Sequence, residues 1–221
     1  MFCSDALAPS LLIFSDSVPQ LLYYSHIPSA IVSLVIGLFV FFSNRKVLLN
    51  RILLTVTLSF SLLVFLNLVS WANIYSRIVT FAWLLLQAVY VSLSIFSLYL
   101  FYVFVFGKDI SYLFKLIGLT VLIVNFGMFS RGYTMSFFDL INCELVDKDF
   151  VFSYQNTIFF LVFISIIIGY IVKFRRTENK TEKRIISIFT LGIFIFLSLL
   201  IFTWQIAGIY ELFTLEQYGQ E

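Results

Sequence analysis

Long apolar stretches, separated by short polar segments, run along almost the whole chain. A helix needs about 20 apolar residues to cross a bilayer, and only helices or closed barrels satisfy their backbone groups in hydrocarbon. The stretches lack the strict alternation of barrel strands. The pattern therefore predicts an all-α fold, a polytopic transmembrane bundle of six helices. The predicted helices lie at residues 28–42, 52–73, 78–106, 113–129, 156–172 and 185–208.

The composition is that of a membrane protein. Hydrophobic residues make up 61% of the 221 residues and charged residues 12%, against about 45–50% and about 25% in soluble domains. A soluble chain of this length could not bury so much apolar surface. We expect the lipid bilayer to be the main partner, because the connecting segments are too short to hold a catalytic or DNA-binding domain.

The chain divides into two regions at the start of the first apolar stretch. Residues 1–27 contain no Lys or Arg, so the basic region of a cleavable signal peptide is missing. We interpret them as an N-terminal extracytoplasmic, interfacial segment, with Tyr23 and Tyr24 at headgroup level. Residues 28–221 form the predicted transmembrane helical domain. His26, the only histidine, is expected to act in helix entry beside Pro28.

Basic residues are distributed very unevenly between the two sides of the predicted membrane. Eleven of the 14 Lys and Arg residues flank the loops after the first, third and fifth stretches, and three lie in the other segments. Basic residues in short loops stay in the cytoplasm. We therefore expect a multi-pass protein of the inner (cytoplasmic) membrane with both termini outside. Six basic residues lie at 173–184, where they set the topology or also attract anionic lipids. Glu178 and Glu182 among them argue against nucleic-acid binding.

The remaining polar segments offer little chemistry. The longest loop, 130–155, is acidic, but its spacing matches no EF-hand, so a solvated loop is expected rather than a calcium site. Cys3 and Cys143 would both lie outside, where a disulfide between them can form, and two free thiols are the alternative. With no Cys/His cluster, the sequence predicts no metal site and no cofactor.

No charged residue lies deep within any predicted helix. Charges inside a membrane usually mark ion paths, proton relays or counter-ions, so this pattern argues against a pump or a proton-coupled transporter. Paired carboxylates and the HExxH spacing are missing too. We expect no enzymatic activity in this chain.

Uncharged polar and aromatic residues gather instead in the predicted outer half of the bundle. Asn67 and Trp71 share one helix face, as do Gln87 and Tyr90. Two interpretations stay open. Either Asn and Gln bridge neighbouring helices while Trp marks the interface, or the outer half encloses an amphipathic ligand pocket. The candidate pocket residues are Asn67, Trp71, Trp83, Gln87, Tyr90, Asn125, Trp204 and Gln205.

The first predicted helix carries a face of small residues. Ser29, Ser33 and Gly37 recur at four-residue spacing. Small residues so placed let two helices approach closely. We expect another helix to pack there.

Several stretches resemble the N-terminal membrane region of bacterial sensor histidine kinases, a region of seven transmembrane helices. The likeness covers most of the chain and rests on hydropathy together with a few Asn, Trp, Cys and Gly positions. It is carried by YYSHIPSAIVSLVIGLFVFFSNRK, NRILL, FLNLVSWAN, FDLINCELV and the closing LEQYG.

The resemblance implies a seventh helix after these residues, then a cytoplasmic dimerisation helix and an ATP-binding kinase domain. None of these elements occurs before Glu221, so kinase activity cannot be assigned to these residues. We expect the chain to be part of a longer protein, since a C-terminus outside needs one more helix to reach the cytoplasm. A kinase-linked receptor of this kind is expected to be a homodimer.

The sequence thus favours a membrane-embedded sensory or signalling input domain of a histidine-kinase-type receptor in a bacterial two-component system. A small or lipophilic ligand, or a property of the membrane, would bias helix packing and act on a cytoplasmic kinase module in cis. The alternative is a small six-helix transporter or channel subunit, which needs a polar path through both halves of the bundle. A lipid-modifying enzyme is a third hypothesis, with no cluster of catalytic residue types behind it.

Overall fold

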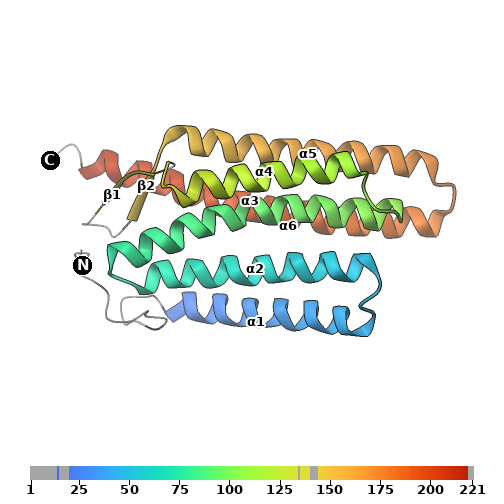
Figure 1. Ribbon diagram of the computed structural model, residues 1–221, viewed down its shortest axis with the longest axis horizontal. Coiled ribbons are helices and arrows are strands. Elements are labelled where there is room, and N and C mark those ends of the chain that lie inside the picture. Colours follow the sequence, from blue (N-terminus) through green and yellow to red (C-terminus); the bar gives the residue numbers. More distant parts are fainter. Residues whose placement is uncertain (1–13, 15–19, 134, 140–143, 219–221) are drawn as a thin grey trace. The chain divides into compact units, whose positions relative to one another are not determined.

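The computed structural model describes Phe14 and residues 20–133, 135–139 and 144–218, without the side chains of residues 139, 144, 147, 149, 152 and 203–218. It divides into two compact units, residues 1–164 (unit 1) and residues 165–221 (unit 2). Unit 1 contains four whole helices, a small sheet and the start of a fifth helix (Figure 1). In chain order these are α1 (Gln20–Ser43), α2 (Leu48–Ala72), α3 (Ser76–Phe106), α4 (Tyr112–Ser130), β1 (Met135–Asp139), β2 (Glu144–Asp147) and α5 (Asp149–Arg176). Unit 2 holds the rest of α5 and α6 (Lys180–Tyr218).

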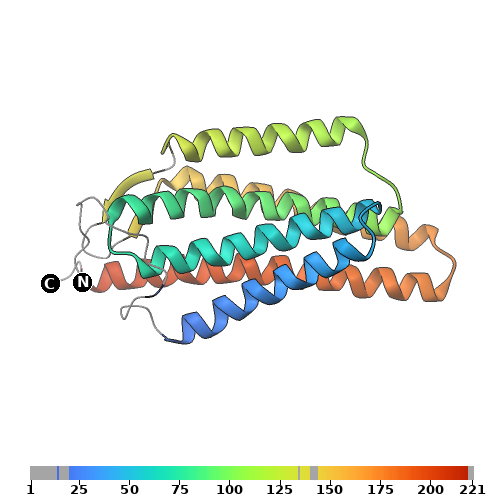
Figure 2. The ribbon, with the colours of Figure 1, turned by 60° about the horizontal axis from the view of Figure 1, so that its bottom comes forward.

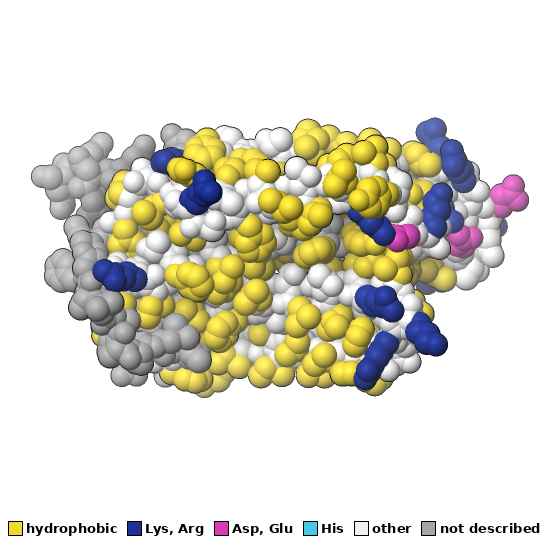
Figure 3. Space-filling view, viewed as in Figure 1, with side chains coloured by type: hydrophobic (Ala, Val, Ile, Leu, Met, Phe, Trp, Pro, Cys, Tyr) yellow, Lys and Arg dark blue, Asp and Glu magenta, His cyan; other side chains and the backbone are white. Residues whose placement is uncertain are grey.

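Six helices in the described part of the chain are long and apolar enough to cross a membrane. The predicted all-α fold class is therefore confirmed, and the chain is a multi-pass helical membrane protein. Hydrophobic side chains cover the sides of the helices, and most Lys and Arg side chains lie toward the helix ends (Figure 3). This distribution is expected where a bilayer surrounds the middle of each helix.

α1 is longer than the apolar stretch that predicted it. It begins at Gln20 instead of residue 28 and continues through Pro28. Helices that lie in a membrane tolerate an internal proline, because nearby side chains and neighbouring helices satisfy freed backbone groups. Ser29 Oγ donates to the carbonyl of Ser25 at 2.5 Å. Ser29 is thus exposed on α1 and does not join the packing face predicted for it.

α1 and α2 are antiparallel neighbours joined by a short loop (Figure 2), and they pack closely along their middle parts. Ser61 Oγ donates to the carbonyl of Ala30 at 2.9 Å, and Ser33 Oγ to the carbonyl of Thr57 at 3.3 Å. A Cβ placed on Gly37 would lie 1.9 Å from Thr57 Oγ1 and 2.9 Å from Thr57 Cβ. The predicted packing face is confirmed at Ser33 and Gly37, because only a residue without a side chain fits at this approach.

The segment predicted as a solvated loop, 130–155, contains an antiparallel hairpin of β1 and β2. Leu145 of β2 is buried, and β2 packs on α3. Strands this short give only a weak alternation of apolar and polar residues, so the sequence pattern missed them. The side chains of the four acidic residues in this segment lie outside the described ones.

Gly132 sets the turn from α4 into the hairpin. Its N–H donates to the carbonyl of Phe129 at 3.0 Å, and the N–H of Tyr133 donates to the carbonyl of Met128 at 3.3 Å. This pair of hydrogen bonds is the Schellman pattern of a helix C-terminus. Gly132 has a φ of 64°, a left-handed conformation that glycine adopts without steric cost. The cap therefore fixes where α4 stops.

α4 is fastened to the rest of unit 1 mainly near its two ends. Its buried residues are Asn125 and Phe129. At the other end Asp109, in the loop before α4, accepts a hydrogen bond from Tyr99 OH at 2.6 Å and forms an ion pair with Lys115. The Lys115 and Tyr99 hydrogen bonds hold the pKa of Asp109 below its ordinary value of 3.8. Most of α4 between these contacts is exposed.

Unit 2 is a helical hairpin whose two helices join at residues 177–179. Tyr170 OH lies 3.1 Å from Ser187 Oγ, so a hydrogen bond links the helices. Lys173 Nζ lies 2.9 Å from Glu182 Oε1. The basic segment predicted at 173–184 is therefore helical on both sides of a short loop, with one of its lysines held in an ion pair.

We expect Gly37→Leu to destabilise the protein, since overpacking a close contact costs about 1–3 kcal/mol. The measurement is the thermal unfolding midpoint in detergent micelles. Gly127→Leu on α4 is the matched control, because a Cβ at Gly127 meets nothing within 4 Å. Equal losses in the two variants would contradict the close approach of α1 and α2.

Asp109→Asn should lower the unfolding midpoint at neutral pH and have little effect in acid. Because the pKa of Asp109 is depressed in the folded protein, its contribution to stability is present above about 3.8. That contribution is lost as the pH falls through the folded-state pKa. The unfolding midpoints of the wild type and the variant should therefore converge as the pH falls below 3.8. A difference that is unchanged in acid would exclude the carboxylate as its cause.

Candidate functional site

α3 carries a buried polar face. Gln87, Tyr90 and Ser94 are buried and lie at i, i+3 and i+7, which is one side of a helix. Ser94 Oγ donates to the carbonyl of Val91 in its own helix at 2.7 Å. Hydroxyl groups often bond in this way within helices. Gln87 and Tyr90 are therefore the members of this face that reach other helices.

Gln87 meets Gln155 of α5 inside unit 1. Gln155 Nε2 donates a hydrogen bond to Gln87 Oε1, and both side chains are buried. One turn farther along, the rings of Tyr90 and Phe159 pack edge to face with centroids 4.8 Å apart. Amide groups in an apolar surrounding need such partners, because an unsatisfied one costs about 1–3 kcal/mol. A polar contact and an aromatic contact therefore join α3 to α5.

Asn125 brings α4 to the same region of α3. Its side chain is fully buried, and Nδ2 donates to the carbonyl of Ala88 at 3.1 Å. Asn125 Oδ1 is also buried, and no described group donates a hydrogen bond to it. Beside this contact, Ala88, Phe129 and Val151 form an apolar cluster. We call the three buried amides Gln87, Asn125 and Gln155 the amide junction.

Three of the eight predicted pocket residues, Gln87, Tyr90 and Asn125, lie at the amide junction. Trp83 lies one turn before Gln87 on α3, with its indole nitrogen buried. The side chains of Trp204 and Gln205 lie outside the described ones, and so do Cys3 and Cys143 with the disulfide considered for them. The junction fits the interpretation in which amides bridge neighbouring helices, because Gln155 of α5 bonds to Gln87 of α3 and Asn125 of α4 bonds to the carbonyl of Ala88 in α3.

Asn67 belongs to a different polar contact, between α1 and α2. Its Nδ2 lies 3.0 Å from His26 Nε2, and His26 Nδ1 lies 3.0 Å from Ser25 Oγ. If Asn67 donates to Nε2, the proton of the neutral ring sits on Nδ1 and is donated to Ser25. His26 was expected to act in helix entry, but α1 begins six residues earlier, so His26 links two helices instead. Trp71 is 52% exposed and lies outside both contacts.

The apolar pattern does not point to Gln155, because the predicted fifth stretch begins one residue after it. A usable signal exists in the helical period. Val151, Gln155, Phe159 and Val162 are all buried, at i, i+4, i+8 and i+11, which is one helix face. Extending that period backward from the apolar stretch would have placed Gln155 toward the core.

In comparisons with known proteins, no protein-family model, no curated protein and no solved structure matches the chain. No family is therefore identified. The described part of the chain contains six candidate spans, and these define its class as a multi-pass helical membrane protein.

Gln87→Leu should destabilise the protein by about 1–3 kcal/mol, because it leaves the amide of Gln155 buried without its partner. The double variant Gln87→Leu/Gln155→Leu should lose less free energy of unfolding than the two single variants lose in sum. The expected coupling is about 0.6 kcal/mol, as for other hydrogen bonds between membrane helices. The measurement is reversible unfolding in mixed micelles.

Thr120→Leu supplies the control for this cycle. Thr120 is exposed, and its hydroxyl bonds to the carbonyl of Leu116 in its own helix. Combined with Gln87→Leu, it should give additive losses. If the stability losses of the Gln87 and Gln155 variants are additive as well, the two amides do not interact.

Proposed function

We propose that this chain is a membrane-embedded sensory input domain in which a small or lipophilic ligand, or a property of the bilayer, shifts α4 against α3. The observation that carries the proposal is Asn125 Oδ1, a buried acceptor with no described donor, on a side chain that bonds to the carbonyl of Ala88, the residue after Gln87 in α3. Buried polar groups nearly always have a partner, and the exceptions call for a reason such as a functional role.

The energy involved has the size that a conformational switch needs. A buried acceptor without a donor costs about 1–3 kcal/mol. Two conformations separated by a few kcal/mol leave the minor one populated at roughly 0.1–10%. Suppose that a donor reaches Asn125 Oδ1 in only one packing of α4. The population ratio of the two conformations would then change about tenfold for each 1.4 kcal/mol of free energy that the new hydrogen bond contributes.

The packing of α4 supports its role as the moving element. α4 packs against α3 much less extensively than α1 packs against α2, so a shift of α4 breaks few contacts. The pair of α1 and α2, in contrast, is locked by the close approach at Gly37. A ligand that acts on α4 would therefore meet little resistance from the rest of unit 1.

The output of the domain is proposed from the resemblance to sensor histidine kinases. On this proposal α4 passes its shift to a cytoplasmic kinase module in cis, within a homodimeric receptor of the inner membrane. The uneven distribution of Lys and Arg supports an N-terminus outside. The lack of charged residues deep in the predicted helices favours sensing over ion or proton transport.

Distances between spin labels test the proposed motion. Labels on Ile123 of α4 and Leu62 of α2, both exposed, should give a main distance and a second, minor one of up to about 10% of the population in the wild type reconstituted in lipid. Asn125→Leu should give a single distance. It removes the unsatisfied acceptor, which on this proposal is what brings the two packings of α4 close in energy. Thr120→Leu, on an exposed position of the same helix, should keep the wild-type distribution.

One narrow distance, identical in all three proteins, would rule out the proposed switch. Solute flux through proteoliposomes that contain the wild type would instead favour the transporter alternative.

A further inference from the structure

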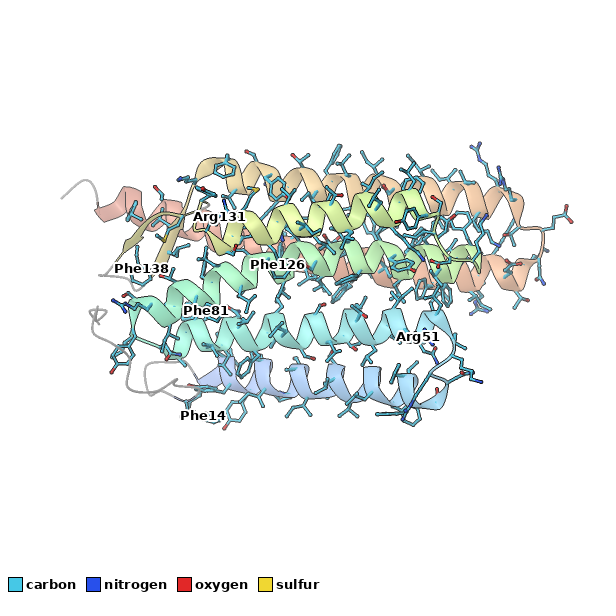
Figure 4. All side chains as sticks on the ribbon, in the orientation of Figure 1. Phe14, Arg51, Phe81, Phe126, Arg131 and Phe138 are labelled. Carbon is cyan, nitrogen blue, oxygen red and sulfur yellow. The ribbon has the colours of Figure 1, made fainter. Side chains whose placement is uncertain are left out.

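A second site of unit 1 lies between the first turns of α3 and strand β1. A cavity of about 440 Å³ opens there, within the range of roughly 300–1,000 Å³ typical of small-molecule sites. Its α3 wall includes Arg77, Thr80, Phe81 and Leu84. We call this cavity the hairpin groove. Figure 4 shows Phe81 on α3 and Phe138 on β1 at the same end of the unit.

The α3 wall changes from polar to apolar along the helix. Arg77 and Thr80 lie in the first turns, and Phe81 and Leu84 lie deeper along the helix. A helix rises 1.5 Å per residue, so roughly 10 Å separates the levels of Arg77 and Leu84. Because α3 is a candidate span, its polar end lies toward the membrane surface and its apolar end toward the hydrocarbon.

The β1 wall owes its shape to an irregularity in the strand. Met135 and Phe138 both line the groove, although side chains three residues apart point to opposite faces of a regular strand. The register shift between Met135 and Phe137 is typical of a bulge, which resets this alternation. Phe137 does not line the groove and is 56% exposed. The strand therefore adds two apolar side chains to the wall.

Charge decides what the groove can hold. The ion pairs among the described side chains engage Asp109 and Glu182 and leave Arg77 without a described carboxylate. The N-terminus of α3 adds partial positive charge to the same end. Phe81 is 68% exposed, so the apolar part of the groove is open along its side. The described lining of the groove thus offers one positive charge above an open apolar surface.

We propose that the hairpin groove binds a single-chain anionic amphiphile of the bilayer, of the fatty-acid type. Its carboxylate lies against Arg77, and its tail runs along Phe81, Leu84 and Phe138. One arginine matches one negative charge, and an open side lets the tail continue into the surrounding lipid. None of the three residues of the amide junction lines the groove, so binding in the groove is tested separately from the proposed shift of α4.

The test is the binding of a spin-labelled fatty acid, and of its methyl ester, to the purified protein in detergent micelles. Arg77→Gln should weaken binding of the acid about tenfold or more, and the acid should then bind no better than the ester. Arg77→Lys should keep a preference for the acid, since it keeps the charge. Arg131→Gln is the matched control, because Arg131 lies at the same end of unit 1 (Figure 4) but does not line the groove.

Two neighbouring phenylalanines test the apolar part. Phe138→Ala should weaken binding of both the acid and the ester, whereas Phe137→Ala should leave both unchanged. The thermal unfolding midpoint of each variant shows that it is folded. Equal losses in Arg77→Gln and Arg131→Gln would show general attraction to a basic surface and overturn the site. Wild-type binding in Arg77→Gln and in Phe138→Ala would overturn it too.

Discussion

The structure depends on one constraint, which is that a backbone in hydrocarbon finds no hydrogen-bond partner except within its own helix. Once each helix has satisfied its backbone, the polar side chains have few places left to bond. Ser94 returns its hydroxyl to α3, Ser61 reaches a carbonyl of α1, and Gln155 bonds to Gln87. These three solutions have different consequences, because only the last two hold one helix against another.

Unit 1 therefore combines a tight contact with a loose one. At Gly37 the two helices α1 and α2 approach until no side chain fits, and hydroxyl groups bond across the contact. α4 buries two residues, one of which is the amide of Asn125. Tight packing gives a fixed frame, and a sparsely packed helix beside it can change position at little cost. This contrast, rather than any reactive group, is what suggests a sensory role for the amide junction. The hairpin groove adds a place where the bilayer itself could supply a ligand.

The sequence predicted the parts of the site that a single helix reveals. Gln87 and Tyr90 share one face of α3 by their spacing, and Asn125 is a polar residue in an apolar stretch. Gln155 was missed, because it precedes the apolar run although it continues the buried face of α5. The first apolar stretch begins at Pro28 and so predicts a helix start beside His26, whereas His26 lies inside α1. The hairpin of β1 and β2 was missed because its strands are too short to show an alternation.

The sequence by itself determined that this protein lies in a lipid bilayer, that its described part contains six long helices, and that small residues line the face of α1 that packs against α2. Hydrophobicity and helical period are local properties, so they can be read from neighbouring residues alone. Only the tertiary structure decided that Gln87 meets Gln155, that Asn67 meets His26, and that Asn125 keeps one buried oxygen without a described donor. These contacts join residues 37 to 68 positions apart in the chain. The geometry of these contacts is set by the tertiary packing of the helices. A bulge in β1 likewise brings Met135 and Phe138 to one wall, which no regular pattern of side chains predicts.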